Sequence, residues 1–123
     1  MICGLGADII EISRIKKAAQ RASFLQRVFT EREIALCRER HNFFASLAVR
    51  FAAKEAVAKA LGTGFRGYGW KDIEILSDSL GKPTVVLRGN AIMIKERLNI
   101  INMGITMSHS KDYAVAFCVA ERE

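Results

Sequence analysis

The chain has 123 residues, half of them hydrophobic, and a formal net charge of +6; a domain of this length buries about two-thirds of its unfolded surface and needs no disulfide staples, so we expect a single domain over residues 1–123. Its three cysteines are an odd number with no Cys-x-x-Cys spacing, which argues against a disulfide framework or a tetrahedral zinc site and favours a reducing cytoplasm. The first ten residues lack a basic leader and no apolar run approaches the ~20 residues of a membrane span, so we expect a cytoplasmic protein without a membrane anchor.

The hydrophobic pattern predicts an α+β fold in which a long central helix packs on an antiparallel sheet. Alternating small and apolar residues indicate a first strand, where Gly4 and Gly6 suggest close approach of another backbone. Thr30 and Glu33 have the spacing of a capping box, and Gly62 suits a left-handed cap after an Ala-rich helix. The expected elements are a strand at 2–9, a helix at 11–21, helices at 30–40 and 43–61, strands at 72–76 and 84–87, a helix at 91–98, and strands at 100–107 and 113–120.

Two irregular segments lie between these elements. Four glycines fall within residues 62–69, and we expect a mobile loop of the kind that closes over ligands. Residues 108–112 form a polar Ser-His-Ser-Lys-Asp turn between the last two strands. Because no nucleophile elbow surrounds this turn, we do not interpret its serines as catalytic nucleophiles.

The positive charge is concentrated in the first half of the chain. Residues 11–59 contain 11 Lys and Arg against five Glu, whereas the remaining residues balance. Such a surface attracts nucleic acid, an acidic protein or a phosphorylated small molecule. Arg14, Lys17 and Arg21 share one face of the first helix, which is either a docking surface or a plain solvated face.

Glu55 and Lys59 lie on a helix whose other positions are mostly small or apolar. Charges in such surroundings need a partner, a metal or a ligand. Together with Asp8 after Gly4-Leu5-Gly6, they suggest a divalent metal and a phosphate. The alternatives are a solvated helix pair worth ~0.3 to 0.5 kcal/mol for Glu55 and Lys59, and a turn acid or helix cap for Asp8. A dinucleotide fingerprint is rejected because its third glycine is absent.

Segments spread over nearly the whole chain resemble, in order and at compatible spacing, the motifs of the holo-acyl-carrier-protein synthase family, the small bacterial-type 4′-phosphopantetheinyl transferases. The most specific of them is the stretch 51–64. The matching segments are Gly4–Ile12 with Arg14, Arg50–Ala56 with Lys59–Gly64, Gly81–Pro83, and Ser108–Ala114.

The resemblance implies an enzyme that transfers 4′-phosphopantetheine from coenzyme A to a serine of apo acyl carrier protein in fatty acid biosynthesis, with release of adenosine 3′,5′-bisphosphate. It also implies Mg²⁺ as cofactor and a homotrimer with active sites between subunits.

The same resemblance implies roles for particular residues. Asp8 and Glu55 would hold Mg²⁺ against the pyrophosphate, and Lys59 would reach the same phosphates. Either a metal-activated water or one of the carboxylates, for which we favour Glu55, would take the serine proton. Arg14, Lys17 and Arg21 would dock the acidic helix of the carrier protein. The residues implied near the coenzyme A nucleotide are Arg50, Lys82 and His109, with Gly62, Gly64 and Pro83 shaping the pocket.

Two rival functions come from other classes. A small basic nucleic-acid-binding module would account for the charge of the first half, but the aromatic residues, mostly Phe within apolar runs, offer no stacking platform. A catalytically silent trimeric scaffold of the same family is the second rival. The presence of the candidate metal-binding carboxylates and of the lysine argues against a silent scaffold.

Overall fold

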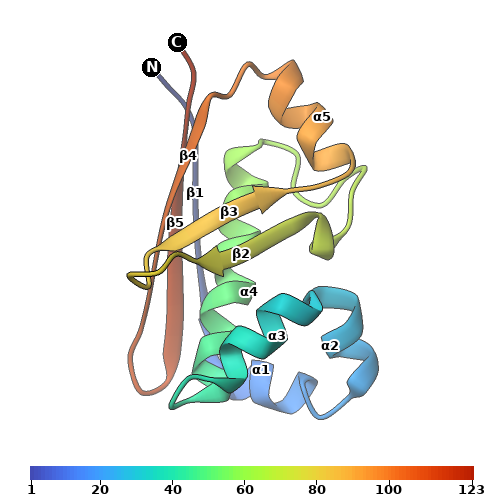
Figure 1. The fold of residues 1–123 in the computed structure, drawn as a ribbon, viewed down its shortest axis with the longest axis vertical. Helices are drawn as coiled ribbons and strands as arrows, with labels where there is room; N and C mark the ends of the chain where they lie inside the picture. The colour runs from blue at the N-terminus through green and yellow to red at the C-terminus, as the bar shows by residue number, and fades with distance from the viewer.

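The computed structural model describes all residues, 1–123. Strands β1, β5 and β4 form an antiparallel sheet in that order, and β2 pairs with β3 in a separate antiparallel hairpin (Figure 1). The expected α+β fold, with a long central helix on an antiparallel sheet, is confirmed. In chain order the elements are β1 Ile2–Glu11, α1 Ile12–Ala18, α2 Ala22–Val28, α3 Glu31–Arg38, α4 Phe43–Ala60, the 3-10 helix η1 Trp70–Asp72, β2 Ile73–Ser77, β3 Pro83–Leu87, α5 Asn90–Arg97, β4 Asn102–His109 and β5 Tyr113–Glu121.

Helix α4 lies along one face of the three-stranded sheet (Figure 1). Small residues on both sides allow this close packing: Ala116 and Ala120 of β5 are completely buried. Gly4 and Gly6 of β1 approach α4 even more closely, because a Cβ atom on either would overlap a carbonyl oxygen of the helix, that of Ala60 or Ala56. The predicted close backbone approach at the two glycines is therefore confirmed.

We expect Gly6→Ala to destabilise the protein by about 1 to 3 kcal/mol, because the added methyl group would push β1 away from α4. Gly104→Ala is the matched control, since a Cβ atom there meets no atom within 4 Å. Urea unfolding measures both variants. Equal stabilities of the two variants would contradict the close contact as the reason for a glycine at position 6.

The helix predicted at 11–21 is shorter in the structure, and a further helix follows it. Helix α1 ends at Ala18, where Gln20 donates from its side chain to the carbonyl of Lys16. Arg21 is extended, and α2 begins at the next residue. Helix α2 was not predicted, because seven residues are too few to give a clear helical repeat.

Helix α3 begins with the predicted capping box. The Thr30 hydroxyl accepts from the Glu33 amide at 3.2 Å, and the Glu33 carboxylate accepts from the Thr30 amide at 2.9 Å. The same Glu33 side chain forms an ion pair with Lys54 of α4 at 2.8 Å, and both side chains are completely buried.

The buried Glu33–Lys54 pair is fully hydrogen bonded. The Lys54 ammonium also donates to the carbonyls of Trp70 and Ile73, and the second Glu33 oxygen accepts from the Ile75 amide at 2.9 Å. Burial lowers the pKa of Lys54, while the Glu33 carboxylate opposes this shift. The pair joins α3, α4 and β2 around one point in the interior.

The face of the sheet that points away from α4 is apolar and open. Leu5 and Ile9 of β1 are 67% and 65% exposed, and Phe117 of β5 is 51% exposed. Their register places them on one surface together with Val115 and Val119. Contiguous exposed apolar surfaces are typical of protein interaction sites. None of the helices has the length and hydrophobicity needed to cross a bilayer.

Candidate active site

Asp8 lies within β1 on the side that faces α4, two residues after Gly6. It is therefore neither a turn acid nor a helix cap. The Lys59 ammonium lies 3.6 Å from an Asp8 carboxylate oxygen and donates to the Ala7 carbonyl at 2.8 Å. Lys59 thus makes its ion pair with Asp8 on the sheet rather than with Glu55 on its own helix.

Glu55 is one helical turn before Lys59, on the same side of α4. Burial raises its pKa, the negative charge of Asp8 raises it further, and Lys59 opposes the shift. Burial also raises the pKa of Asp8, against the effect of Lys59. The two carboxylates are thus within electrostatic range of each other and share a single lysine.

This acid pair suits a cation that is bound jointly with a ligand. No group of three or more His, Cys, Asp or Glu side chains comes together in the structure, so the chain alone offers no complete cage. Mg²⁺ is usually held by one or two carboxylates together with phosphate oxygens and water. Two partly desolvated carboxylates of raised pKa fit this requirement, because a divalent cation would relieve their repulsion.

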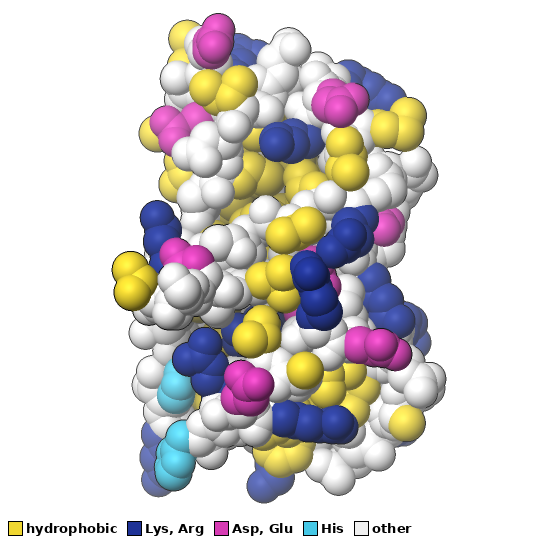
Figure 2. Space-filling model, viewed as in Figure 1, with side chains coloured by type: hydrophobic (Ala, Val, Ile, Leu, Met, Phe, Trp, Pro, Cys, Tyr) yellow, Lys and Arg dark blue, Asp and Glu magenta, His cyan; other side chains and the backbone are white.

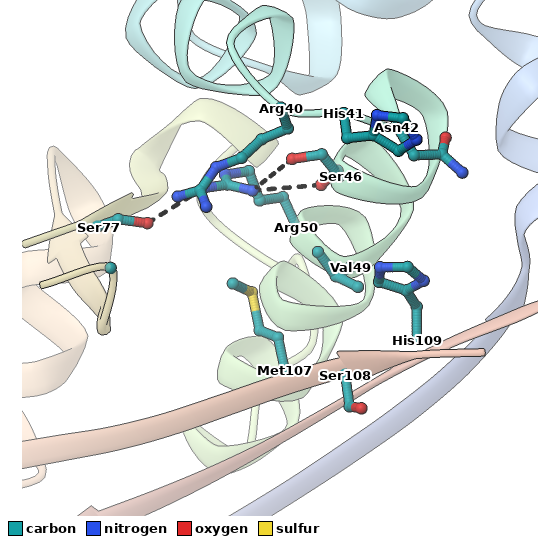
Figure 3. Close-up of a pocket in the computed structure, with 11 residues that line it drawn as sticks. Arg40, His41, Asn42, Ser46, Val49, Arg50, Ser77, Met107, Ser108 and His109 are labelled. Carbon is teal, nitrogen blue, oxygen red and sulfur yellow. Dashed lines mark hydrogen bonds between the residues drawn. The ribbon is translucent and has the colours of Figure 1, made fainter.

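A second candidate site is a cavity of about 430 Å³ between α4, the β2–β3 hairpin and the end of β4. Its lining is polar and basic, and includes Arg40, His41, Ser77, Ser108 and His109 (Figure 3). Figure 2 shows the two histidine side chains on one face, with Lys and Arg side chains beside them. Such a lining is suited to a phosphate group.

Arg50 is the buried cation of this cavity. Its guanidinium donates to the Ser46 hydroxyl at 2.9 Å and the Ser77 hydroxyl at 3.3 Å (Figure 3). It also donates to the Ile75 carbonyl at 3.3 Å, and the three bonds together fix its plane. The structure therefore brings together Arg50 and His109, two of the residues that the sequence indicated. Gly81, next to Lys82 in the hairpin turn, also lines the cavity.

The acid pair and the Arg50 cavity lie on different sides of α4. Lys59 follows Arg50 by nine residues, which is about two and a half turns and places the two side chains on opposite sides of the helix. Neither Asp8, Glu55 nor Lys59 lines the cavity. Within one protomer the structure thus separates predicted site residues into two groups.

Arg40, His41, Ser46 and Ser77 were not predicted as site residues. They come from the α3–α4 connection, the first turn of α4 and the end of β2, so only the folded chain brings them together. In the sequence, only the adjacent basic residues Arg40 and His41, just before a helix start, could have indicated a phosphate-binding site here.

Hydrogen bonds connect the 62–69 loop, which the sequence predicted to be mobile, to α4 and α5. Gly62 and Gly64 have φ values of 80° and 58°, which glycine adopts without strain. Their amides donate to the carbonyls of Lys59 and Ala58 at the end of α4. The side chain of Asn90 on α5 donates to the Gly67 carbonyl at 2.8 Å.

The three predicted docking residues, Arg14, Lys17 and Arg21, line one surface depression of about 510 Å³. Helix α2 adds Phe24 and Arg27 to it. We call these five residues the basic surface. The sequence could not indicate the α2 contribution, because α2 itself was not predicted.

Comparisons with known proteins identify the family of the chain. Residues 4–118 match the model of the 4′-phosphopantetheinyl transferase superfamily. The chain is 50% identical to the holo-[acyl-carrier-protein] synthase of Alkaliphilus oremlandii over 98% of this chain and 99% of the relative. It is 48% identical to that of Clostridium acetobutylicum, with 98% of each chain covered.

Solved structures show the same similarity. The holo-[acyl-carrier-protein] synthase of Neisseria meningitidis has a TM-score of 0.91 at 37% identity, covering 99% of this chain and all of the other. That of Bacillus anthracis, in complex with CoA (3′,5′-ADP), has a TM-score of 0.82 at 36% identity, covering 100% and 99%. The chain therefore belongs to the 4′-phosphopantetheinyl transferase superfamily, and within it to the holo-[acyl-carrier-protein] synthases.

Proposed function

We propose that this chain is a Mg²⁺-dependent holo-[acyl-carrier-protein] synthase that primes the acyl carrier protein of fatty acid biosynthesis in the cytoplasm. The observation that carries the proposal is the meeting of Asp8, Glu55 and Lys59 between β1 and α4 in a chain of this family. A related structure from Bacillus anthracis was solved with CoA (3′,5′-ADP). The free thiols of the three cysteines suit a reducing compartment.

In the proposed reaction, the serine hydroxyl oxygen of the carrier protein attacks the phosphorus next to pantetheine. A new serine–phosphate bond forms, and the bridging bond of the pyrophosphate breaks to release adenosine 3′,5′-bisphosphate. Asp8 and Glu55 would hold the Mg²⁺, which when bound neutralises phosphate charge and polarises phosphorus.

The residues of the chain have separate tasks in this scheme. Glu55, whose pKa is raised by burial and by Asp8, is our candidate to accept the serine proton. Lys59 uses one N–H on the Ala7 carbonyl and faces Asp8 at 3.6 Å, which leaves a further N–H for the leaving bisphosphate. Removal of the serine proton by a metal-activated water is the alternative.

We also propose a homotrimer whose active sites lie between subunits. Arg50 and Lys59 lie on opposite sides of α4, which favours a coenzyme A bound between Arg50 of one subunit and Lys59 of the next. The exposed apolar side chains Leu5, Ile9 and Phe117 give the sheet a surface for assembly. In this arrangement one subunit would bind the nucleotide phosphates in its Arg50 cavity, with Lys82, Pro83 and His109. The next subunit would place its acid pair and its Gly62–Gly64 turn beside them.

The direct test is mass spectrometry of apo acyl carrier protein incubated with coenzyme A, Mg²⁺ and this chain. We expect the mass of one phosphopantetheine on the carrier serine, and no addition without the chain. An unmodified carrier would overturn the proposed function and favour a silent scaffold.

We expect replacement of Arg14, Lys17 and Arg21 by alanine to raise KM for the carrier protein about tenfold, with kcat nearly unchanged. Complementary charges promote the encounter of two proteins and are screened by salt. The variant should therefore lose much of the salt dependence of kcat/KM. A control with three other exposed basic residues replaced, Lys71, Arg97 and Arg122, should behave as the wild type. Equal effects in both variants would contradict a dedicated docking surface.

The raised pKa of Glu55 gives a prediction for pH. Because burial and Asp8 disfavour the ionised form, Glu55 should lose its proton at a higher pH than an exposed glutamate, and activity should fall as pH decreases through this pKa. NMR titration of the metal-free protein checks the cause. Asp8→Asn should lower the pKa of Glu55, and Lys59→Met should raise it. An ordinary pKa in the wild type would contradict the proposed coupling.

A further inference from the structure

Aromatic side chains from four parts of the chain form a continuous row. The Phe24 ring of α2 stacks on Phe51 of α4 with centroids 6.3 Å apart, and Phe51 stacks on Trp70 at 4.8 Å. Trp70 stacks on Phe65 of the 62–69 loop at 4.0 Å, and Phe65 contacts Tyr68 at 5.6 Å. The row therefore connects the basic surface, which includes Phe24, with the loop that follows α4.

The row passes beside the candidate acid pair. Phe51 is one helical turn before Glu55, as Lys59 is one turn after it, so all three side chains share one side of α4. At the other end of the row, burial raises the pKa of the Tyr68 phenol, and the negative charge of Glu55 adds to this effect. Tyr68 is therefore within electrostatic range of Glu55.

Hydrogen bonds fix the orientation of the Tyr68 hydroxyl. The Thr63 hydroxyl donates its only proton to the Gly64 carbonyl at 2.8 Å. In the 3.2 Å contact between Tyr68 and Thr63, the phenol must then be the donor. This bond closes the loop on itself and directs the phenolic proton toward Thr63.

The second half of the loop depends on these side chains for its position. The amides of Gly62 and Gly64 donate hydrogen bonds to the end of α4, and the Gly67 carbonyl accepts one from the Asn90 side chain of α5. Gly67 has a φ of 85°, a conformation with little steric restriction for glycine. At the end of the loop, Gly69 donates to the Asp72 carboxylate at 3.0 Å and accepts from the Asp72 amide. Between Gly64 and Gly67, the stacking of the Phe65 ring on Trp70 is the anchor.

We propose that Phe65 is a positioning residue for phosphopantetheine transfer, because its stacking on Trp70 holds residues 65–69 beside the Glu55 side of α4. The inference rests on the proposed function. Phe65 binds neither metal nor phosphate; it keeps the loop wall in place, so that the carrier serine and the pyrophosphate align. A small misplacement of reacting groups costs as much as about a hundredfold in rate.

The test compares Phe65→Ala with Phe65→Tyr, which keeps the ring. We expect Phe65→Ala to lower kcat about ten- to a hundredfold, with KM for coenzyme A within about twofold, because the proposed phosphate-binding residues Arg50, Lys59 and His109 lie outside residues 65–69. Phe65→Tyr should restore kcat. Phe43→Ala removes a ring of the separate Phe43–Phe44 pair and should leave kcat near wild type at a comparable loss of stability.

Amide hydrogen exchange supplies a readout that does not need activity. In Phe65→Ala, the hydrogen-bonded amides on either side of this segment, those of Gly64 and Gly69, should exchange at least about tenfold faster, whereas the amides of α4 should keep their protection. Unchanged exchange in the loop, or an equal loss of kcat in Phe43→Ala, would overturn the positioning role. A wild-type protein without transfer activity would instead overturn the proposed function, and the exchange experiment would still decide whether Phe65 anchors the loop.

Discussion

Replacing Asp8 or Glu55 by alanine should lower turnover by about 10²- to 10⁴-fold and leave the fold intact. Each side chain supplies one of the two carboxylates that meet between β1 and α4, and a cation held by one carboxylate would be bound weakly and displaced. Because burial raises the pKa of both groups, their ionised forms strain the folded protein rather than support it. Circular dichroism and thermal unfolding should therefore show no loss of structure.

The same variants test metal binding separately from catalysis. Mg²⁺ together with coenzyme A should raise the Tm of the wild type, because a ligand that binds only the folded state stabilises it. Both alanine variants should lose the part of this shift that depends on Mg²⁺. Glu96→Ala, which removes an exposed acid on α5, is the control. It should keep both the turnover and the Mg²⁺-dependent Tm shift of the wild type. Near-normal turnover in both acid variants would remove Asp8 and Glu55 from the mechanism.

Lys54→Met should destabilise the protein by about 3 to 5 kcal/mol, the largest effect on stability that we expect. The substitution leaves the completely buried Glu33 carboxylate without its counter-charge, and removal of one partner from a buried ion pair is far more costly than replacement of both. Two backbone amides still donate to Glu33, those of Thr30 and Ile75. Urea unfolding at neutral pH measures the loss.

The double variant Glu33→Leu, Lys54→Met separates the loss of charge pairing from the loss of packing. We expect it to be more stable than Lys54→Met alone, because no unpaired charge stays buried. Lys71→Met, at an exposed lysine, should change stability by less than about 0.5 kcal/mol. A double variant no more stable than Lys54→Met would show that the unpaired Glu33 charge is not the cause of the loss.

Local signals in the sequence predicted most of the fold. The Thr30–Glu33 capping box, the Ala-rich run of α4 and the paired glycines of β1 each depend on neighbours within a few positions. Helix α2 lacked such a signal. The partner of Lys54 could not be predicted either, because Glu33 lies 21 positions earlier and meets it only after α3 and α4 have packed together.

The candidate site was predictable to the extent that its motifs are contiguous. Asp8, Glu55 and Lys59 stand in motifs that resemble the family, and the structure places them together. Arg50 belongs to the same motif as Glu55, yet it opens into a different cavity. Helical periodicity predicts that Arg50 and Glu55 point in different directions, but the cavity around Arg50 also requires Ser77 and His109 from distant strands. Tertiary packing, which no short pattern encodes, therefore decides which neighbours in the sequence serve one ligand.

The separation of the Arg50 cavity from Lys59 by the body of α4 has a consequence for the cell. Under the proposed assembly, an isolated protomer holds only fragments of catalytic machinery. The rate of carrier priming would then rise more steeply than the concentration of this protein, because three copies must first assemble.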